Sequence, residues 1–190
     1  MVEVLVKICG LTREQDVDAA VEAGADMVGF VVVPSSPRGV DVARARDLAR
    51  RAPEHVRSVA VFRDPDGVPP GVHDDFDLVQ VYGLPASTER TILAFDRLPL
   101  PALPDGVPVL LDRPKGVPER DDDLREHWRR AAGVGGRVML AGGLHPGNVA
   151  DAVRCARPWA VDTARGVEAE PGVKDDALIR AFVRNAKEAA

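Results

Sequence analysis

The feature that most constrains this chain is the repeated alternation of a short apolar run with a helix or turn signal. In the first third, apolar runs lie at residues 4–8, 27–33 and 58–62, and helical patterns at about 15–22 and 42–51 separate them. Continuous apolar runs are typical of strands that are covered on both faces of a sheet. This β-α-β-α-β pattern predicts a parallel sheet with right-handed crossovers.

The same alternation continues to the end of the chain. Further strands are expected at residues 78–81, 91–95, 109–112, 138–141 and 159–162. Further helices are expected at about 121–132, from Pro146 or Asn148 to 157, and from 177 onward. Eight strands fit an α/β fold of the (β/α)8 TIM barrel type better than an open doubly wound sheet. We therefore expect a single barrel domain over residues 1–190.

The middle third is less regular. Proline and glycine are frequent at residues 63–77 and 96–108, so a full helix is not expected in either connection. Parallel strands normally need a crossover of about a dozen residues or more, usually with a helix. We therefore expect shortened or missing helices here, and uncovered apolar surface that would favour a homodimer.

Composition limits the classes of partner. The chain has 190 residues, a formal net charge of −5 and a pI of about 5.4, which argue against a nucleic-acid surface or an anionic membrane as partner. We expect no signal segment before the first strand, and no apolar run approaches membrane-spanning length. The two cysteines, Cys9 and Cys155, form neither a disulfide framework nor a metal-binding spacing. These features predict a cytoplasmic protein without metal or cofactor.

The segment at residues 7–12, Lys-Ile-Cys-Gly-Leu-Thr, joins the first strand to the first helix. The apolar pattern breaks at Gly10, and residues 12–15 have the spacing of a helix capping box. Cys9 is therefore expected at the carboxyl end of a strand, the edge where parallel α/β folds build their active sites. A thiol there can act as a base if its thiolate is stabilised, although a buried structural cysteine is commoner.

Asp112 and Arg38 are expected at the same edge. Asp112 ends an apolar strand, where partial burial favours the protonated carboxyl group that a general acid needs. A helix or loop cap is the alternative role for this side chain. Arg38 lies between Pro37 and Gly39 on a stiff loop, and its planar guanidinium suits a carboxylate or a phosphate. Simple surface solvation is its alternative.

Two neighbouring loops could bind a phosphate. Gly142 and Gly143 follow an apolar strand, where their backbone N–H groups can face an anion. The polar turn after the next strand consists of Thr163, Ala164, Arg165 and Gly166. Barrels frequently bind phosphate between the loops after strands seven and eight, and Arg165 could add a positive charge there. Without a phosphate, both segments would be ordinary tight turns.

Taken in order, these motifs resemble those of one enzyme family. They are the segments at residues 7–12, 29–31, 36–38, 79–81, 110–112, 140–144, 166–168 and 171–175. Over nearly its whole length the chain resembles phosphoribosylanthranilate isomerase, a barrel enzyme of tryptophan biosynthesis. The resemblance implies a cofactor-free Amadori rearrangement of N-(5-phosphoribosyl)anthranilate to 1-(2-carboxyphenylamino)-1-deoxyribulose 5-phosphate.

The resemblance also implies roles for individual residues. Cys9 would be the general base that removes the C2 proton, and Asp112 the general acid that protonates the ring oxygen. Arg38 would pair with the anthranilate carboxylate. The other implied substrate-binding residues are Lys7, Gln80, Tyr82, Gly142, Gly143, Asp162, Thr163, Ala164, Arg165 and Gly166. The implied ligand is a small phosphorylated anion.

Three segments depart from the family pattern. Tyr82-Gly83 replaces the usual His-Gly, residues 113–120 lack the usual loop glycines, and Ala164 and Arg165 replace two phosphate-binding serines. Three hypotheses therefore remain. The chain is the isomerase itself, a diverged paralogue for a related amino sugar or aryl amine in specialised metabolism, or a non-catalytic barrel that binds a small anion.

Overall fold

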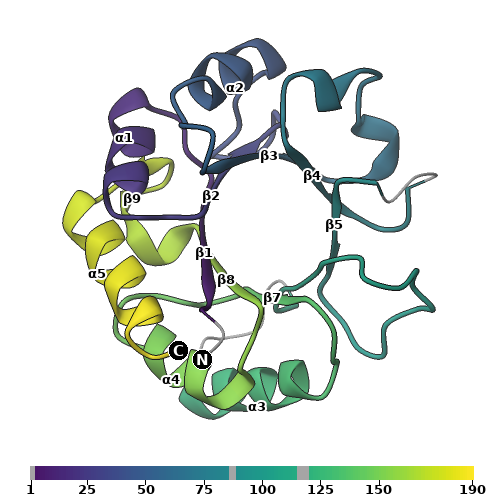
Figure 1. Cartoon of the computed structure of the whole chain (residues 1–190), viewed down its shortest axis with the longest axis vertical. Coiled ribbons are helices and arrows are strands. Elements are labelled where there is room, and N and C mark those ends of the chain that lie inside the picture. Colours follow the sequence, from purple (N-terminus) through teal and green to yellow (C-terminus); the bar gives the residue numbers. More distant parts are fainter. Residues whose placement is uncertain (1–2, 86–88, 115–119) are drawn as a thin grey trace.

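The structure, a computed structural model, is a closed barrel of eight parallel strands that follow one another in sequence order (Figure 1). It describes residues 3–85, 89–114 and 120–190. The barrel strands are β1 Leu5–Cys9, β2 Met27–Val31, β3 Arg57–Phe62, β4 Leu78–Tyr82, β5 Thr91–Phe95, β6 Val109–Leu111, β7 Val138–Leu140 and β8 Ala160–Thr163. Because β8 pairs with β1, the ring is complete, and the predicted (β/α)8 barrel is confirmed.

The described residues form five α-helices outside the ring (Figure 1). They are α1 Glu14–Glu22, α2 Val42–Ala49, α3 Asp121–Ala132, α4 Val149–Ala156 and α5 Asp176–Lys187. Each buries one apolar face, as α5 does with Ile179, Phe182, Val183 and Ala186. In these ranges no helix combines the length and the apolar character that crossing a bilayer requires.

The predicted shortening of the middle helices is also confirmed. Between β3 and β6 the described residues contain only two single-turn 3-10 helices, η1 Pro65–Gly67 and η2 Val72–Asp74. The strands nevertheless pair in regular parallel register, with Gln80 opposite Val61 and Tyr82 opposite Ala94. Backbone hydrogen bonds therefore close the ring here with no α-helix in the described connections. We call residues 63–114 the helix-poor side and the remainder of the barrel the helix-covered side.

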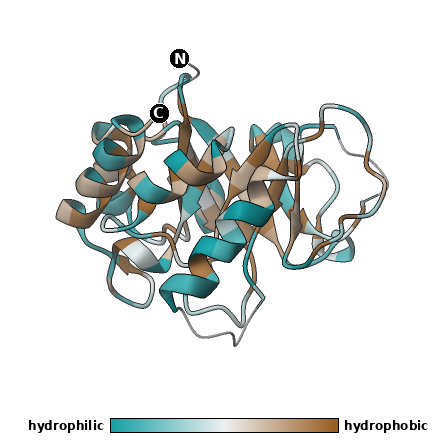
Figure 2. Ribbon diagram, turned by 90° about the horizontal axis from the view of Figure 1, so that it is seen from below, coloured by the Kyte–Doolittle hydropathy of each residue, from teal (hydrophilic) through white to brown (hydrophobic). Residues whose placement is uncertain are grey.

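Alternation along each strand sorts its side chains between two cores. In β1, Val6 and Ile8 pack outward in the layer between the ring and the helices. Lys7 and Cys9 are buried on the opposite face, and Cys9 packs with the residues that fill the barrel interior. Figure 2 shows this apolar ring next to helices whose outer faces are hydrophilic. Polar side chains at the inward positions therefore enter the barrel rather than solvent.

The C-terminal part adds a small structure that the sequence did not predict. A 3-10 turn, η3 Arg165–Val167, follows β8 and leads into an antiparallel hairpin of β9 Glu168–Glu170 and β10 Val173–Lys174. This hairpin explains why the predicted capping box at residues 12–15 is wrong. The Thr12 hydroxyl donates to the carbonyl of Gly172 at 2.7 Å, and Arg13 becomes the N-cap of α1 without a side-chain hydrogen bond.

Candidate functional site

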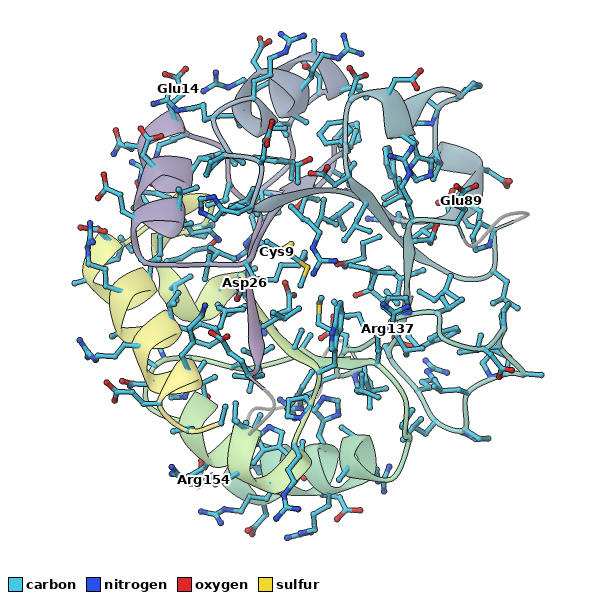
Figure 3. The ribbon with its side chains drawn as sticks, viewed as in Figure 1. Cys9, Glu14, Asp26, Glu89, Arg137 and Arg154 are labelled. Carbon is cyan, nitrogen blue, oxygen red and sulfur yellow. The ribbon has the colours of Figure 1, made fainter. Side chains whose placement is uncertain are left out.

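The candidate site lies inside the ring at the carboxyl ends of the strands, the face where TIM barrels carry out chemistry. Cys9 is the last residue of β1, and its side chain points into the ring (Figure 3). Asp112 directly follows β6, and Tyr82 is the last residue of β4. The fold therefore brings the predicted base and the predicted acid to the same end of the barrel.

A buried ion pair lies beside Cys9. Lys7 Nζ is 2.8 Å from Asp162 Oδ1, and the Lys7 side chain has no exposure to solvent. Strand pairing makes this contact, because Lys7 of β1 stands opposite Asp162 of β8. Burial alone would lower the pKa of Lys7, but the charges of Asp162 and Cys9 outweigh it and raise that pKa above its usual range. Lys7 therefore stays an ammonium ion.

Opposing effects act on the pKa of the Cys9 thiol. Burial raises the pKa of Cys9, while the charge of Lys7 and its hydrogen bond to the sulfur act in the opposite direction. Gly29 of β2 makes room for both groups, because a Cβ atom there would lie 3.0 Å from Cys9 Sγ and 3.1 Å from Lys7 Nζ. Lys7 is therefore the group that can stabilise a thiolate at Cys9.

Asp112 is held by two hydrogen bonds. The Tyr82 hydroxyl donates to Oδ2 at 2.8 Å, and the backbone N–H of Arg113 donates to Oδ1 at 2.8 Å. Burial and then the charge of Asp112 raise the pKa of Tyr82, so its phenol keeps the proton that it donates. Asp112 is half-buried, as expected for the residue after a barrel strand. Both donors favour the carboxylate that remains after Asp112 gives up a proton.

Arg38 is also at this face, and its guanidinium is hydrogen-bonded to Glu168. Nε and Nη2 donate to the two carboxylate oxygens of Glu168 at 2.7 and 2.6 Å. The Arg38 stem crosses Gly10, where a Cβ atom would lie 2.8 Å from Cδ, and Gly10 has a φ of +71° that favours glycine. Arg38 thus lies over the loop that follows Cys9. Glu168 belongs to the family motif at residues 166–168, and no local pattern in the sequence indicates this contact.

The loops after β7 and β8 contact each other. The Thr163 hydroxyl donates to the Leu144 carbonyl at 2.7 Å, and a Cβ atom at Gly166 would clash with the same oxygen. Gly142 and Gly143 have φ angles of +85° and +75°, the left-handed conformation that favours glycine. The two segments predicted to bind phosphate are therefore adjacent.

The remaining predicted positions differ in their surroundings. Gln80 is buried inside the ring, and its amide oxygen has no hydrogen-bond partner among the described residues. The Ala164 carbonyl accepts a hydrogen bond from Lys174 Nζ at 2.9 Å. Arg165 begins η3, and its side chain is exposed. Most of the 113–120 loop lies outside the described residues.

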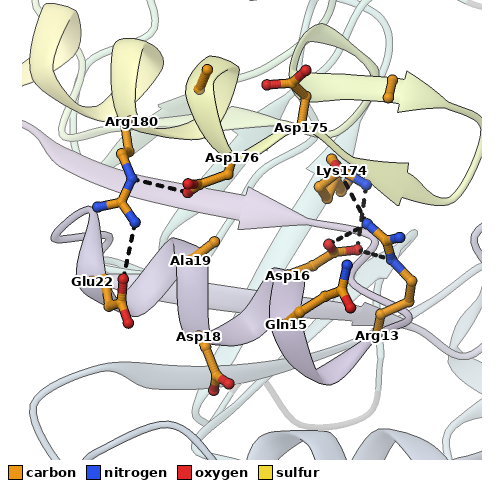
Figure 4. A pocket seen from close by; sticks show the side chains of 12 residues that line it. Arg13, Gln15, Asp16, Asp18, Ala19, Glu22, Lys174, Asp175, Asp176 and Arg180 are labelled. Atoms are coloured by element: carbon orange, nitrogen blue, oxygen red, sulfur yellow. Dashed lines mark hydrogen bonds and ion pairs between the residues drawn. The ribbon is translucent and has the colours of Figure 1, made fainter.

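A separate groove of about 710 Å³ lies outside the ring between α1 and α5 (Figure 4). Several of its charged side chains pair with one another. Arg13 binds Asp16, and Arg180 binds both Asp176 and Glu22. The Arg180–Glu22 pair connects α5 to α1, so we assign the groove a structural role. Within the described ranges, no group of three acidic, histidine or cysteine side chains could hold a metal ion.

Comparison with known proteins decides the family. The profile of N-(5′-phosphoribosyl)anthranilate (PRA) isomerase matches residues 6–96 and 115–185 of the chain. The chain belongs to the PRA isomerase family. It is therefore an isomerase, and the family predicted from the motifs is confirmed.

Individual PRA isomerases are similar over nearly the whole chain. The enzyme of Bordetella pertussis is 42% identical over 92% of each chain. That of Chromohalobacter salexigens is 42% identical over 94% of this chain and 92% of its own. The crystal structure from Thermotoga maritima has a TM-score of 0.80 at 31% identity and covers 97% of this chain and 99% of that one. A PRA isomerase solved with reduced 1-(o-carboxyphenylamino)-1-deoxyribulose 5-phosphate has a TM-score of 0.75 at 33% identity, with the same coverage.

Proposed function

We propose that this chain converts N-(5-phosphoribosyl)anthranilate to 1-(2-carboxyphenylamino)-1-deoxyribulose 5-phosphate, with Cys9 as general base and Asp112 as general acid. The observation that carries the proposal is that Cys9 and Asp112 lie at the same end of the ring, each in contact with a group that can stabilise its charged form. Cys9 contacts the buried ammonium of Lys7, and Asp112 accepts the Tyr82 hydroxyl. Membership in the PRA isomerase family supports the choice of substrate.

The first step opens the ribose ring. Protonated Asp112 donates its proton to the ring oxygen, the bond between C1 and that oxygen breaks, and the nitrogen lone pair forms a C1=N iminium. Tyr82 and the Arg113 amide already point at the carboxylate oxygens. They stabilise the negative charge that develops on Asp112 and so favour proton transfer.

The second step moves the double bond. Cys9, as thiolate, takes the proton from C2, and the released electron pair forms C1=C2 while the iminium nitrogen becomes neutral. The resulting enol then tautomerises to the C2 ketone, with a second hydrogen on C1. Lys7 favours this step because its positive charge stabilises the thiolate in a buried setting. One acid and one base with different surroundings thus supply both proton transfers.

The two ends of the substrate carry the groups that the site can recognise. Arg38 pairs with the anthranilate carboxylate, since a guanidinium binds planar carboxylates well. The phosphate binds between the loop of Gly142 and Gly143 and the turn at residues 163–166, where Arg165 supplies charge in place of the usual serines. The buried Gln80 amide oxygen accepts a hydrogen bond from the substrate. Asp162 fixes Lys7 in place.

The test is the consumption of phosphoribosylanthranilate, followed by its fluorescence. We expect turnover by the wild-type protein, and kcat values about 10²–10⁴-fold lower for Cys9→Ala and Asp112→Asn. Cys155→Ala, which alters the exposed cysteine, is the matched control and should keep the wild-type rate. Thermal unfolding would confirm that each variant folds.

Three results would contradict this proposal. Unchanged kcat in both variants would refute the acid–base pair. A folded wild-type protein without turnover would favour the paralogue with another substrate, and the altered turn at residues 163–166 would be the first segment to examine. A protein that binds a small phosphate anion but turns over no amino sugar would favour the non-catalytic barrel.

We further propose that two copies associate in the cytoplasm. The PRA isomerase of Thermotoga maritima is described as dimeric. Among the residues described here, the exposed large apolar side chains are Leu84 and Leu98, and both belong to the helix-poor side. Both cysteines are free, which suits a reducing compartment. Size-exclusion chromatography with light scattering should show a dimer, and a clean monomer would contradict the association.

A further inference from the structure

Lys174 of β10 is a buried cation to which the proposed chemistry gives no role. Its side chain has no solvent exposure. Nζ donates to Glu168 Oε1 at 2.8 Å and to the Ala164 carbonyl at 2.9 Å. Burial of an ammonium ion is costly unless acceptors compensate for the lost water. Burial indeed lowers the pKa of Lys174, although Glu168 opposes that shift.

Glu168 connects this cation to the substrate face. Its two oxygens accept both Arg38 hydrogen bonds, and Oε1 also accepts from Lys174 and from the backbone N–H of Gly172 at 3.3 Å. Burial alone would raise the pKa of Glu168, but the hydrogen bonds and charges of Arg38 and Lys174 outweigh it and hold that pKa below its usual range. Glu168 is therefore a carboxylate that binds two cations at once.

Together, Arg38, Glu168 and Lys174 carry a net positive charge, and Arg38 is the outermost of the three. Arg38 and Glu168 alone would be a neutral pair, with little attraction for an anion. Lys174 restores one positive charge. Of the three side chains, Arg38 is the most exposed, at 16%, against 6% for Glu168 and 0% for Lys174. Among the described residues, none accepts a hydrogen bond from Arg38 Nη1, so this nitrogen can meet a ligand.

We propose that Lys174 is a positioning residue that compensates Glu168, so that Glu168 can orient Arg38 without cancelling the positive charge that Arg38 offers to the aryl carboxylate of the substrate. This inference rests on the proposed function, in which Arg38 pairs with that carboxylate. The same ammonium also holds the Ala164 carbonyl, in the turn assigned to the phosphate. One buried lysine thus fixes a loop at each end of the substrate.

The experiment compares two stable ligands. One is reduced 1-(o-carboxyphenylamino)-1-deoxyribulose 5-phosphate, and the other is the same compound without its carboxyl group. The ratio of their Kd values, measured by titration calorimetry, is the carboxylate preference of each protein. The proteins are wild type, Lys174→Met, Glu168→Gln and the double variant, and phosphoribosylanthranilate turnover by each is measured in parallel.

The two single variants should change the preference in opposite directions. Lys174→Met leaves a neutral Arg38–Glu168 pair, so the preference should fall about tenfold, mainly through weaker binding of the carboxylated ligand. Glu168→Gln leaves two cations, so the preference should stay at the wild-type value or rise. The double variant restores a single positive charge on Arg38 and should recover most of the preference.

A purely structural role would give a different pattern. If both single variants lost the preference, or if Lys174→Met weakened both ligands equally, the inference would be overturned. If Lys174→Met did not fold, a double variant that failed to keep the wild-type preference would overturn it as well. Wild-type turnover separates this result from the proposed function. If the wild-type protein turns over the substrate and Lys174→Met leaves the carboxylate preference unchanged, only the charge compensation is refuted. If Lys174→Met alters the preference but the wild-type protein shows no turnover, only the proposed reaction is refuted.

Discussion

The helix-covered and helix-poor sides of the barrel each contribute one of the two proposed catalytic groups, and they hold it in different ways. On the helix-covered side, Cys9 is buried, contacts the ammonium of Lys7 and packs against Gly29. On the helix-poor side, Asp112 is only half-buried, and the hydrogen bonds that it accepts come from Tyr82 and from the adjacent amide. The proposed base is thus buried in the barrel interior, whereas the proposed acid is partly exposed to solvent.

This difference shows that the position of a side chain and its stabilisation have separate structural causes. Asp112 reaches the carboxyl end of the ring because the strand register is continuous through β3, β4, β5 and β6, where the described connections contain no α-helix (Figure 1). Strand pairing is therefore sufficient to place Asp112. The helices add buried apolar surface, which stabilises the fold. Substitutions in the packed parts of the helix-covered side should accordingly cost more stability than comparable substitutions on the helix-poor side.

The largest expected effect is that of Lys7→Met. It leaves Asp162 as an uncompensated buried carboxylate, so the free energy of unfolding should fall by about 3–5 kcal/mol. Denaturant unfolding measures this change, and Lys7→Met combined with Asp162→Leu should recover most of it. Arg50→Gln, which removes an exposed ion pair with Asp47, is the control and should have almost no effect. A change as small as that of the control would contradict the role of the buried pair.

Two glycines in similar 3-10 turns compare the sides directly. Gly166→Ala on the helix-covered side would place a Cβ atom against the Leu144 carbonyl, and the required backbone shift should cost about 1–3 kcal/mol. Gly67→Ala on the helix-poor side would meet only Asp64 Oδ1 at 3.6 Å and should be nearly neutral. Thermal unfolding of both variants checks this prediction. Equal losses would show that the two turns are packed alike.

Tyr82→Phe should separate activity from stability on the helix-poor side. The variant keeps the ring but loses the hydrogen bond to the Asp112 carboxylate, so kcat should fall about tenfold while unfolding changes little. In an Asp112→Asn background the same substitution should have no further effect, because Tyr82 acts through Asp112. An additional tenfold loss in that background would indicate that Tyr82 contacts the substrate independently.

The smallest predicted effect is an alkaline loss of stability that originates at Cys9. Because burial raises the pKa of Cys9 in the folded protein, the unfolded chain ionises first as the pH increases. The stabilising contribution is complete below the unfolded pKa and is lost as the pH rises from there through the folded pKa. Unfolding at several alkaline pH values should show a shallower decline for Cys9→Ala than for wild type. Cys155→Ala, at the exposed cysteine, should keep the wild-type decline.

Much of the fold could be predicted from local pattern. Apolar runs marked all eight strands, and the prolines and glycines between Phe62 and Val109 correctly excluded α-helices from the residues described there. Two-residue alternation also places Lys7 with Cys9, and Gln80 with Tyr82, on the inner face of the ring. The family followed from the order of the motifs along the chain.

The features that could not be predicted from the sequence are contacts between distant segments. The pairing of Thr12 with Gly172 replaced a predicted helix cap, and no local pattern indicates a partner so far along the chain. The Arg38–Glu168–Lys174 cluster likewise unites the β2 loop with the C-terminal hairpin. Its members are individually ordinary charged residues, so their burial becomes evident only once the barrel is closed.

The central claim is that Cys9, rather than Asp112, removes the proton from C2, and a kinetic isotope effect tests it most directly. The measurement compares substrate with hydrogen or deuterium at C2, using wild type, Cys9→Ser and Asp112→Asn. Cys9→Ser weakens the base and slows C2 deprotonation, so its isotope effect should exceed that of wild type, whereas Asp112→Asn should show no increase. An increase in Asp112→Asn, without one in Cys9→Ser, would mean that the acid and base assignments are reversed.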